Sequence, residues 1–173
     1  AGQASARAER TFYLTIALVM AAGIIAGFLP SWFLRHWMHQ PIMAPLTPWI
    51  WLHGIVFTAW LALFVTQVSL ISAGNRPLHM KLGMAGFGFA ALLFVVGLTA
   101  ALHGAARGAN PPPFAPDQWL AVPIFALLSP AILLPLGLAN RRRDSQAHKR
   151  YMLMAMVAFT TPGFGRLLFM PFW

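Results

Sequence analysis

The feature that most constrains this chain is an apolar segment from Trp49 to Ser72, which carries few polar residues, among them His53 and Gln67. A helix needs about 20 mainly apolar residues to cross a hydrocarbon core about 30 Å thick. This segment has that length and is too apolar throughout for an ordinary soluble helix, which has a polar face. The sequence therefore predicts that it crosses a membrane.

The composition of the whole chain points to the same class of protein. Apolar residue types make up 59% of the 173 residues and charged types 9%, whereas a soluble domain carries about 25% charged residues. The net charge of +9 sits mainly between apolar segments and forms no basic helix face, so nucleic acid is not an expected partner. The absence of cysteine excludes thiolate sites, and three acidic residues are too few for a carboxylate-rich metal site.

Four further apolar segments have a similar length. We expect an all-α, polytopic membrane helix bundle with five transmembrane helices in a single domain, preceded by a short solvated tail and surrounded by the lipid bilayer. The expected spans cover residues 11–29, 49–72, 82–102, 118–139 and 151–172. The fourth span contains three prolines and the fifth is interrupted at Thr160–Gly165, so we expect both to be irregular.

The distribution of basic residues predicts the orientation. The tail and the second and fourth loops hold nine Lys or Arg residues, whereas the first and third loops hold two. Cytoplasmic loops of membrane proteins carry the excess of Lys and Arg. The N-terminus is therefore expected in the cytoplasm. In this orientation most tryptophans fall at the outer membrane interface, where an aromatic belt is expected.

Small and polar residues predict how the helices pack. Gly83, Ala90 and Gly97 lie at heptad spacing in the third span, which we expect to be the closely packed, central helix. His53 and Gln67 flank Trp60 at intervals of seven residues and so share one helix face. That face is expected to point into the bundle, because an amide is costly against lipid.

Four histidines at span ends are the candidate cofactor ligands. His53 and His103 lie on the expected outer side, and His79 and His148 on the inner side. A b-type haem requires two axial imidazoles from facing helices, and basic groups that meet its propionates. Either pair could hold haem b, with Arg166 as a propionate partner for the outer pair. The alternative is that each histidine has only a structural role at the membrane interface.

The first loop offers a different metal site. His36, Met38 and His39 stand close together there, with Met43 a few residues on. Imidazole and thioether groups are ligands that suit copper. Copper bound at the external face, with His53 or His103 completing the site, is therefore a second cofactor hypothesis.

Three stretches resemble a known group of proteins: WLHGIVFTAWLALFVTQVSLI, LHMKLG and HKRYMLMAMVAF. They are similar to motifs of small uncharacterised bacterial multi-helix membrane proteins with LHRRLG-like and HKRLM-like histidine motifs, which are distantly similar to cytochrome b-type bundles. The resemblance covers roughly residues 49–170 and rests on His53, His79 and His148, while Met80 departs from it. It implies a multi-pass protein of the bacterial inner (plasma) membrane.

The leading functional hypothesis is a haem-b-binding electron-transfer or redox-accessory protein that works with a redox partner. A second hypothesis is a cofactor-free assembly or scaffold subunit of a membrane complex, which would use the small-residue face of the third span to contact other subunits. A third is a copper-handling membrane protein.

Overall fold

The computed structural model describes residues 2–37, 46–110 and 114–169, and all the regular structure in these ranges is helical. The helices are α1 (Gly2–Phe28), α2 (Pro48–Ser72), α3 (Arg76–Ala106), α4 (Pro116–Asn140) and α5 (Ser145–Phe169), and a π-helical turn, η1 (Leu29–Phe33), follows α1. The all-α class predicted from the sequence is confirmed for this part of the chain.

Side chains at several helix starts explain where the chain changes direction. Asn75 precedes α3, and its side-chain oxygen accepts a hydrogen bond from Leu78 N–H at 3.2 Å. Asp144 precedes α5 in the same way and accepts from Gln146 N–H at 2.9 Å. Such N-caps satisfy donors that a helix leaves free in its first turn. Gly74, between α2 and α3, has a φ of +78°, a left-handed conformation that favours glycine.

Helix α1 begins earlier than the first expected span. It starts at Gly2 rather than near Thr11, so the predicted solvated tail is largely exposed but helical. The physical reason is composition, because the segment after Gly2 is rich in Ala, Arg, Gln and Glu, which are strong helix formers.

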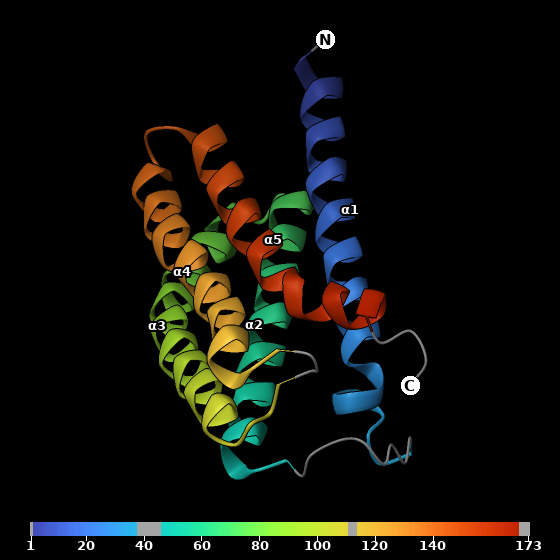
Figure 1. Cartoon of the computed structure of the whole chain (residues 1–173). Helices are drawn as coiled ribbons and strands as arrows, with labels where there is room; N and C mark the ends of the chain where they lie inside the picture. The colour runs from blue at the N-terminus through green and yellow to red at the C-terminus, as the bar shows by residue number, and fades with distance from the viewer. Residues whose placement is uncertain (1, 38–45, 111–113, 170–173) are drawn as a thin grey trace.

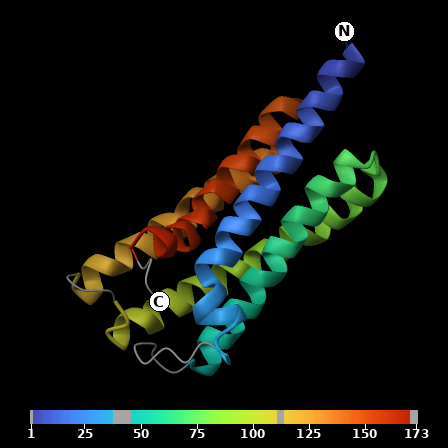
Figure 2. The same ribbon diagram turned by 90° about the vertical axis from the view of Figure 1, so that its right-hand side faces the viewer.

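The five helices form a closed ring. Each helix packs mainly against two neighbours: α1 on α2, α2 on α3, α3 on α4, α4 on α5, and α5 back on α1. Figures 1 and 2 show that the helices run roughly alongside one another, while the last part of α5 turns toward α1. This turn follows Pro162, which lies inside α5 and removes a main-chain donor.

The centre of the ring is filled by side chains gathered around Trp60. Its indole N–H donates to the Met156 sulphur at 3.3 Å, and its ring meets the edge of Phe159 with centroids 6.2 Å apart. Phe89 approaches from α3, with a centroid separation of 6.3 Å. Trp60 therefore joins α2, α3 and α5 and lies inside the bundle, as the sequence predicts.

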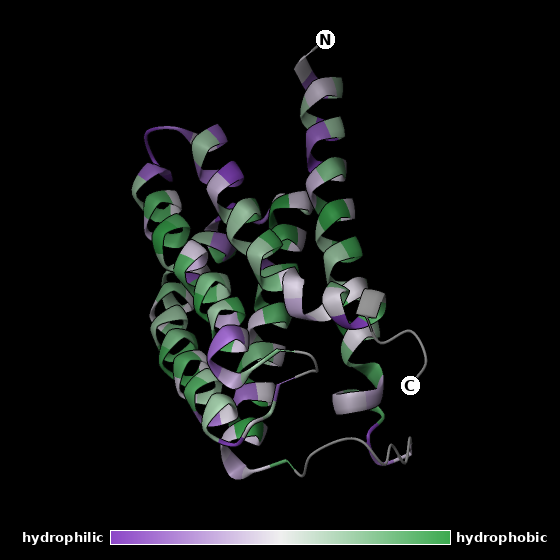
Figure 3. Cartoon of the chain, viewed as in Figure 1, coloured by the Kyte–Doolittle hydropathy of each residue, from purple (hydrophilic) through white to green (hydrophobic). Residues whose placement is uncertain are grey.

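The outer surface of the bundle is apolar along most of its height. Figure 3 shows hydrophobic residues over the middle of the helices and hydrophilic residues concentrated toward their ends. Large exposed apolar side chains occur on every helix, for example Val19, Ile55, Val95, Phe125 and Val157. Among the described residues, four helices are long and apolar enough to cross a membrane: α1 with η1, α2, α3 and α4. Apolar helices of this kind indicate a multi-pass protein in contact with lipid.

Helix α5 is not one of these four, although the sequence predicts a span at residues 151–172. It packs on α1 and α4 along its length, bends at Pro162, and carries two threonines and Arg166 in its second half. The presence of five spans and the orientation of the chain therefore stay predictions.

Glycines allow the backbones of α1 and α5 to approach closely. A Cβ added to Gly27 would lie 2.0 Å from the Gly163 carbonyl oxygen, and one added to Gly163 would lie 2.7 Å from Ile24 Cα. Gly23 and Gly27 are four residues apart, the spacing that allows helix backbones to approach closely in membranes. On α3, Gly83 faces Gln67 and Gly97 faces Leu127 through side chains instead. Among the glycines of the described residues, the backbone-to-backbone approach is thus between α1 and α5, whereas α3, the expected closely packed span, is the most buried of the four apolar helices.

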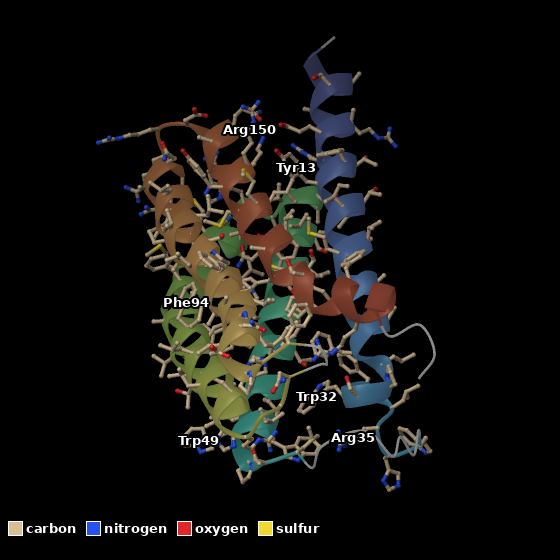
Figure 4. All side chains as sticks on the ribbon, viewed as in Figure 1. Tyr13, Trp32, Arg35, Trp49, Phe94 and Arg150 are labelled. Carbon is tan, nitrogen blue, oxygen red and sulfur yellow. The ribbon has the colours of Figure 1, made fainter. Side chains whose placement is uncertain are left out.

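The bundle has two chemically distinct ends. We call the end where α1, α3 and α5 begin the basic end, and the end that carries Trp32, Trp49, Trp51 and Trp119 the tryptophan end. In Figure 4, Arg150 marks the first of these, and Trp32 and Trp49 mark the second.

Candidate functional site

Two of the predicted ligands meet at the basic end. His79 lies in the first turn of α3 and His148 in the first turn of α5, and both are half-buried. The centroids of the two imidazole rings are 6.4 Å apart, and the ring planes make an angle of 83°. The structure therefore brings together the inner pair that the sequence suggests, although α3 and α5 are not adjacent in the ring.

Main-chain oxygens orient both rings. His148 Nδ1 lies 2.8 Å from the carbonyl oxygen of Gly137 in α4, and His79 Nδ1 lies 3.3 Å from that of Gln67 in α2. A carbonyl oxygen can only accept, so each of these bonds needs a proton on Nδ1 and leaves the Nε2 lone pair free. This is the arrangement that metal-binding histidines commonly adopt.

The side chain of Gln67 gives His79 a second partner. When its amide nitrogen faces the ring, that nitrogen donates to His79 Nδ1 at 2.6 Å and to the His79 carbonyl at 3.1 Å, while the amide oxygen accepts from Gly83 N–H at 3.0 Å. Nδ1 is then an acceptor, and the ring proton is on Nε2. When the amide is reversed, its oxygen and the Gln67 main-chain oxygen both face an Nδ1–H group. The orientation of Gln67 and the tautomer of His79 are thus linked.

The geometry of the pair fits two axial ligands of one metal. Ring centres would then lie about 6 Å apart, twice the sum of a metal–nitrogen bond of about 2 Å and a nitrogen-to-centre distance of about 1 Å. The observed 6.4 Å agrees with this, and perpendicular rings are compatible with it because each ligand can rotate about its own bond to the metal. The centroid distance is therefore compatible with two ligands of one haem iron between α3 and α5.

Cationic groups surround this pair, but one is already engaged. Lys149 Nζ lies 2.9 Å from Glu9 Oε2, and Gln146 Nε2 donates to Glu9 Oε1 at 2.8 Å. Arg76 lies close enough to His79 to interact with it electrostatically. Arg76 and the exposed Arg150 are therefore better placed than Lys149 to meet a negatively charged group at this end.

The outer pair is not brought together in the same way. His103, near the end of α3, has Nε2 3.3 Å from the hydroxyl of Thr47, which precedes α2. His53 lies six residues beyond Thr47, about 9 Å further along α2 and on a different face of it. Its ring instead packs on Phe57, with centroids 4.3 Å apart. The outer pair therefore lacks the facing arrangement of His79 and His148.

His53 and Arg166 nevertheless lie near each other. Nδ1 of His53 is buried and has no hydrogen-bond partner among the described residues. Arg166 is close enough for an electrostatic interaction with His53. Its guanidinium donates to the Pro162 carbonyl at 2.9 Å and lies 4.2 Å from the ring centre of Phe28.

The predicted copper site lies mostly outside the described residues. His36 is exposed and its ring lies 5.7 Å from that of Trp37, whereas Met38, His39 and Met43 fall outside the described residues. In the part of the chain that the structure describes, no group of three or more His, Cys, Asp or Glu residues could hold a metal ion. A site with two histidines and an organic ligand, as in a haem protein, does not require such a group.

Comparison with protein-family models, curated proteins and solved structures found no match. The resemblance of the histidine motifs to bacterial membrane proteins therefore stays a prediction, and the functional argument rests on the geometry. Sequence reasoning missed Gly137, whose carbonyl orients His148. The sequence gives little indication of this contact, because any main-chain carbonyl can accept a hydrogen bond from a histidine ring.

Proposed function

We propose that this chain is a membrane protein that binds haem b at the basic end, with His79 and His148 as axial ligands, and that it serves in electron transfer or as a redox accessory. The observation that carries the proposal is the pairing of two imidazoles from different helices at 6.4 Å, each with Nδ1 near a main-chain carbonyl.

Main-chain carbonyls and arginine side chains would each have a role in holding the haem. The Gly137 carbonyl would hold the Nδ1 proton of His148, and the Gln67 carbonyl that of His79 when the Gln67 amide turns its oxygen toward the ring. Each Nε2 lone pair would then be free to bind the iron. Arg76 and Arg150 provide positive charge for the haem carboxylates. When bound, haem supplies a one-electron iron couple, and the bundle supplies a low-dielectric setting that tunes its potential.

The decisive experiment is a reduced-minus-oxidised optical spectrum of the detergent-purified chain, produced in haem-replete cells. We expect sharp α and Soret bands from the wild type, and their loss or a large shift in both His79→Ala and His148→Ala, because each variant removes one axial ligand. His103→Ala is the matched control, since this histidine bonds Thr47 at the opposite end.

Two outcomes would contradict the proposal. A wild-type spectrum without haem bands would remove it altogether. Bands that survive in H79A and H148A but disappear in His53→Ala or H103A would move the haem to the tryptophan end.

The two other functional hypotheses gain less support. A scaffold subunit is expected to expose the small-residue face of the third span, but Gly83 and Gly97 are covered by Gln67 and Leu127 within the chain. For copper, most of the suggested ligands lie outside the described residues. Metal analysis of the sample used for the optical spectrum would reveal copper directly.

A further inference from the structure

The charge of Arg166 is not balanced by an acidic side chain of this chain. The sequence contains three such residues: Glu9, Asp117 and Asp144. Glu9 pairs with Lys149, Asp144 caps α5 at the basic end, and Asp117 is exposed in the first turn of α4. A cation that is partly withdrawn from water is costly without an opposite charge. No acidic side chain of this chain is thus shown beside Arg166, which makes an anion from another molecule a candidate counter-charge.

The guanidinium also retains unused donors. It carries five N–H groups, and within the described residues the structure gives it one hydrogen bond, to the Pro162 carbonyl. Its contact with the Phe28 ring holds the planar group in a fixed orientation. The remaining N–H groups form a fork of the kind that binds phosphate or carboxylate oxygens in pairs.

The position of Arg166 indicates which kind of anion it is expected to meet. The end of α1, which carries Phe28, leads into η1, where Trp32 lies against Gly54 of α2. Trp32 and Trp51 pack with ring centroids 4.9 Å apart. Tryptophans of membrane proteins concentrate at the level of the lipid headgroups. Arg166 contacts Phe28, four residues before Trp32, so it lies toward the tryptophan end, and we expect lipid phosphate groups near this end.

His53 supplies a second polar group at the same place. It precedes Gly54, against which Trp32 packs, and it interacts electrostatically with Arg166. Its Nδ1 is buried without a partner among the described residues, which is unfavourable unless a ligand group completes it. A neutral imidazole protonated on Nδ1 could donate this hydrogen to a phosphate oxygen once the side chains that cover Nδ1 move aside.

We infer that Arg166 and His53 form a binding site for the phosphate of an anionic membrane lipid, held between α1, α2 and the bent end of α5. The site is independent of the haem proposal, because it lies at the opposite end from His79 and His148. The alkyl chains of such a lipid would lie along the exposed apolar surface of the helices.

The test compares lipid binding by variants of the full chain in a non-ionic detergent. Phosphatidylglycerol or phosphatidylcholine is added, and lipids retained per chain are counted by native mass spectrometry while the melting temperature is recorded. We expect wild type to retain phosphatidylglycerol preferentially and to gain stability from it. Arg166→Gln should lose one retained phosphatidylglycerol and most of the associated increase in melting temperature.

Arg143→Gln is the matched control, because Arg143 is an exposed arginine at the basic end. It should keep both effects, which separates a specific site from general attraction of anionic lipid to a basic protein. His53→Phe keeps an aromatic ring but removes Nδ1, and it should also weaken retention. If R166Q does not fold, H53F decides the question by the same two measurements.

Haem content is measured on the same samples. It should be unchanged in R166Q, since Arg166 is remote from the proposed axial ligands. Lipid retention in R166Q equal to wild type would overturn the inference. Loss of haem with unchanged lipid retention would do so too, and would identify Arg166 as a partner of a haem carboxylate.

Discussion

The two ends of the bundle both contain histidines, but they use them differently. At the basic end, His79 and His148 come from different helices, His148 is bonded to the Gly137 carbonyl, and His79 Nδ1 lies near the main chain and the amide of Gln67. At the tryptophan end, His103 bonds a threonine, while His53 stacks on Phe57 and leaves Nδ1 unpaired. The comparison teaches that a histidine near a helix end is a ligand candidate when something fixes its ring and a second ring faces it.

The packing of the helices separates the ends in a similar way. At the basic end, Glu9 bridges from α1 to Lys149 and Gln146 of α5 through polar contacts. Closer to the tryptophan end, the same two helices meet at Gly27 and Gly163 with almost no space between their backbones. The first contact is adjustable and the second is not, so substitutions at the two should differ greatly in effect.

The largest effect is expected from Gly27→Val. Its side chain would overlap the Gly163 carbonyl, so α1 and α5 must separate, and overpacking of this kind costs about 1–3 kcal/mol or more. The variant should show a strongly lowered melting temperature in detergent. Gly88→Ala is the control, because nothing lies within 4 Å of a Cβ at Gly88, and it should leave the melting temperature almost unchanged. Equal melting temperatures for G27V and wild type would refute the close approach of α1 and α5.

Gln67→Ala should act at the basic end alone. Loss of the amide removes the contact with His79 Nδ1 that depends on the tautomer of this ring. Loss of a group that hydrogen-bonds a metal ligand typically changes metal affinity about 10- to 100-fold. For the haem proposed at this end, we expect weaker retention and a shifted midpoint potential, measured by redox titration. Thr66→Ala is the matched control, because the Thr66 hydroxyl is exposed and bonds Ala62 O within α2. A haem potential that moves equally in both variants would show that Gln67 has no special role.

The sequence predicts the helices better than it predicts how they face each other. Apolar length alone locates α2, α3 and α4, and the alternation of spans places His79 and His148 at one end. It does not fix the rotation of a helix about its axis, because a membrane helix is apolar toward lipid as well as toward its neighbours. For this reason the partners of His53 and His103 could not be foreseen.

The sequence does contain a pattern that indicates the α1–α5 contact. Gly23 and Gly27 are four residues apart within an apolar run, but close packing is predicted from the small residues of the third span instead. The deciding factor is what lies opposite. Gly163 on α5 leaves room for the backbone of α1, whereas Gly83 and Gly86 on α3 face the side chains of Gln67 and Leu63. Complementary small residues on two helices, rather than a stripe on one, allow the closest approach.

Substitutions in the centre of the bundle, between the two ends, should have effects of intermediate size. Met156→Leu keeps the size of the side chain but removes the acceptor of the Trp60 indole N–H, which costs about 1–3 kcal/mol when the donor stays buried. Trp60→Phe removes the donor, so the double variant should be less destabilised than the sum of the single ones. Thermal unfolding of all four proteins measures this coupling. Strict additivity would show that the hydrogen bond contributes nothing.

The smallest effect is expected from Glu9→Gln. Glu9 lies before the apolar part of α1, and its hydrogen bonds from Lys149 and Gln146 lower the pKa of its carboxyl group. A lowered folded-state pKa means that the pair stabilises the fold above the unfolded carboxyl pKa of about 4.3, and that this contribution is lost as the pH falls through the folded pKa. Because both groups are about one-third exposed, the contribution should be that of a surface pair, about 0.2–1 kcal/mol.

Melting temperatures of wild type and E9Q should therefore differ slightly at pH 7 and converge at acid pH. The difference should also shrink in high salt, because salt screens exposed pairs. Arg142→Gln serves as the control for a charge change at the same end, since Arg142 is exposed. A difference between wild type and E9Q that grows as the pH falls would mean that protonated Glu9 is the more stabilising form. Ionised Glu9 would then destabilise the fold, which is the opposite of what its ion pair with Lys149 predicts.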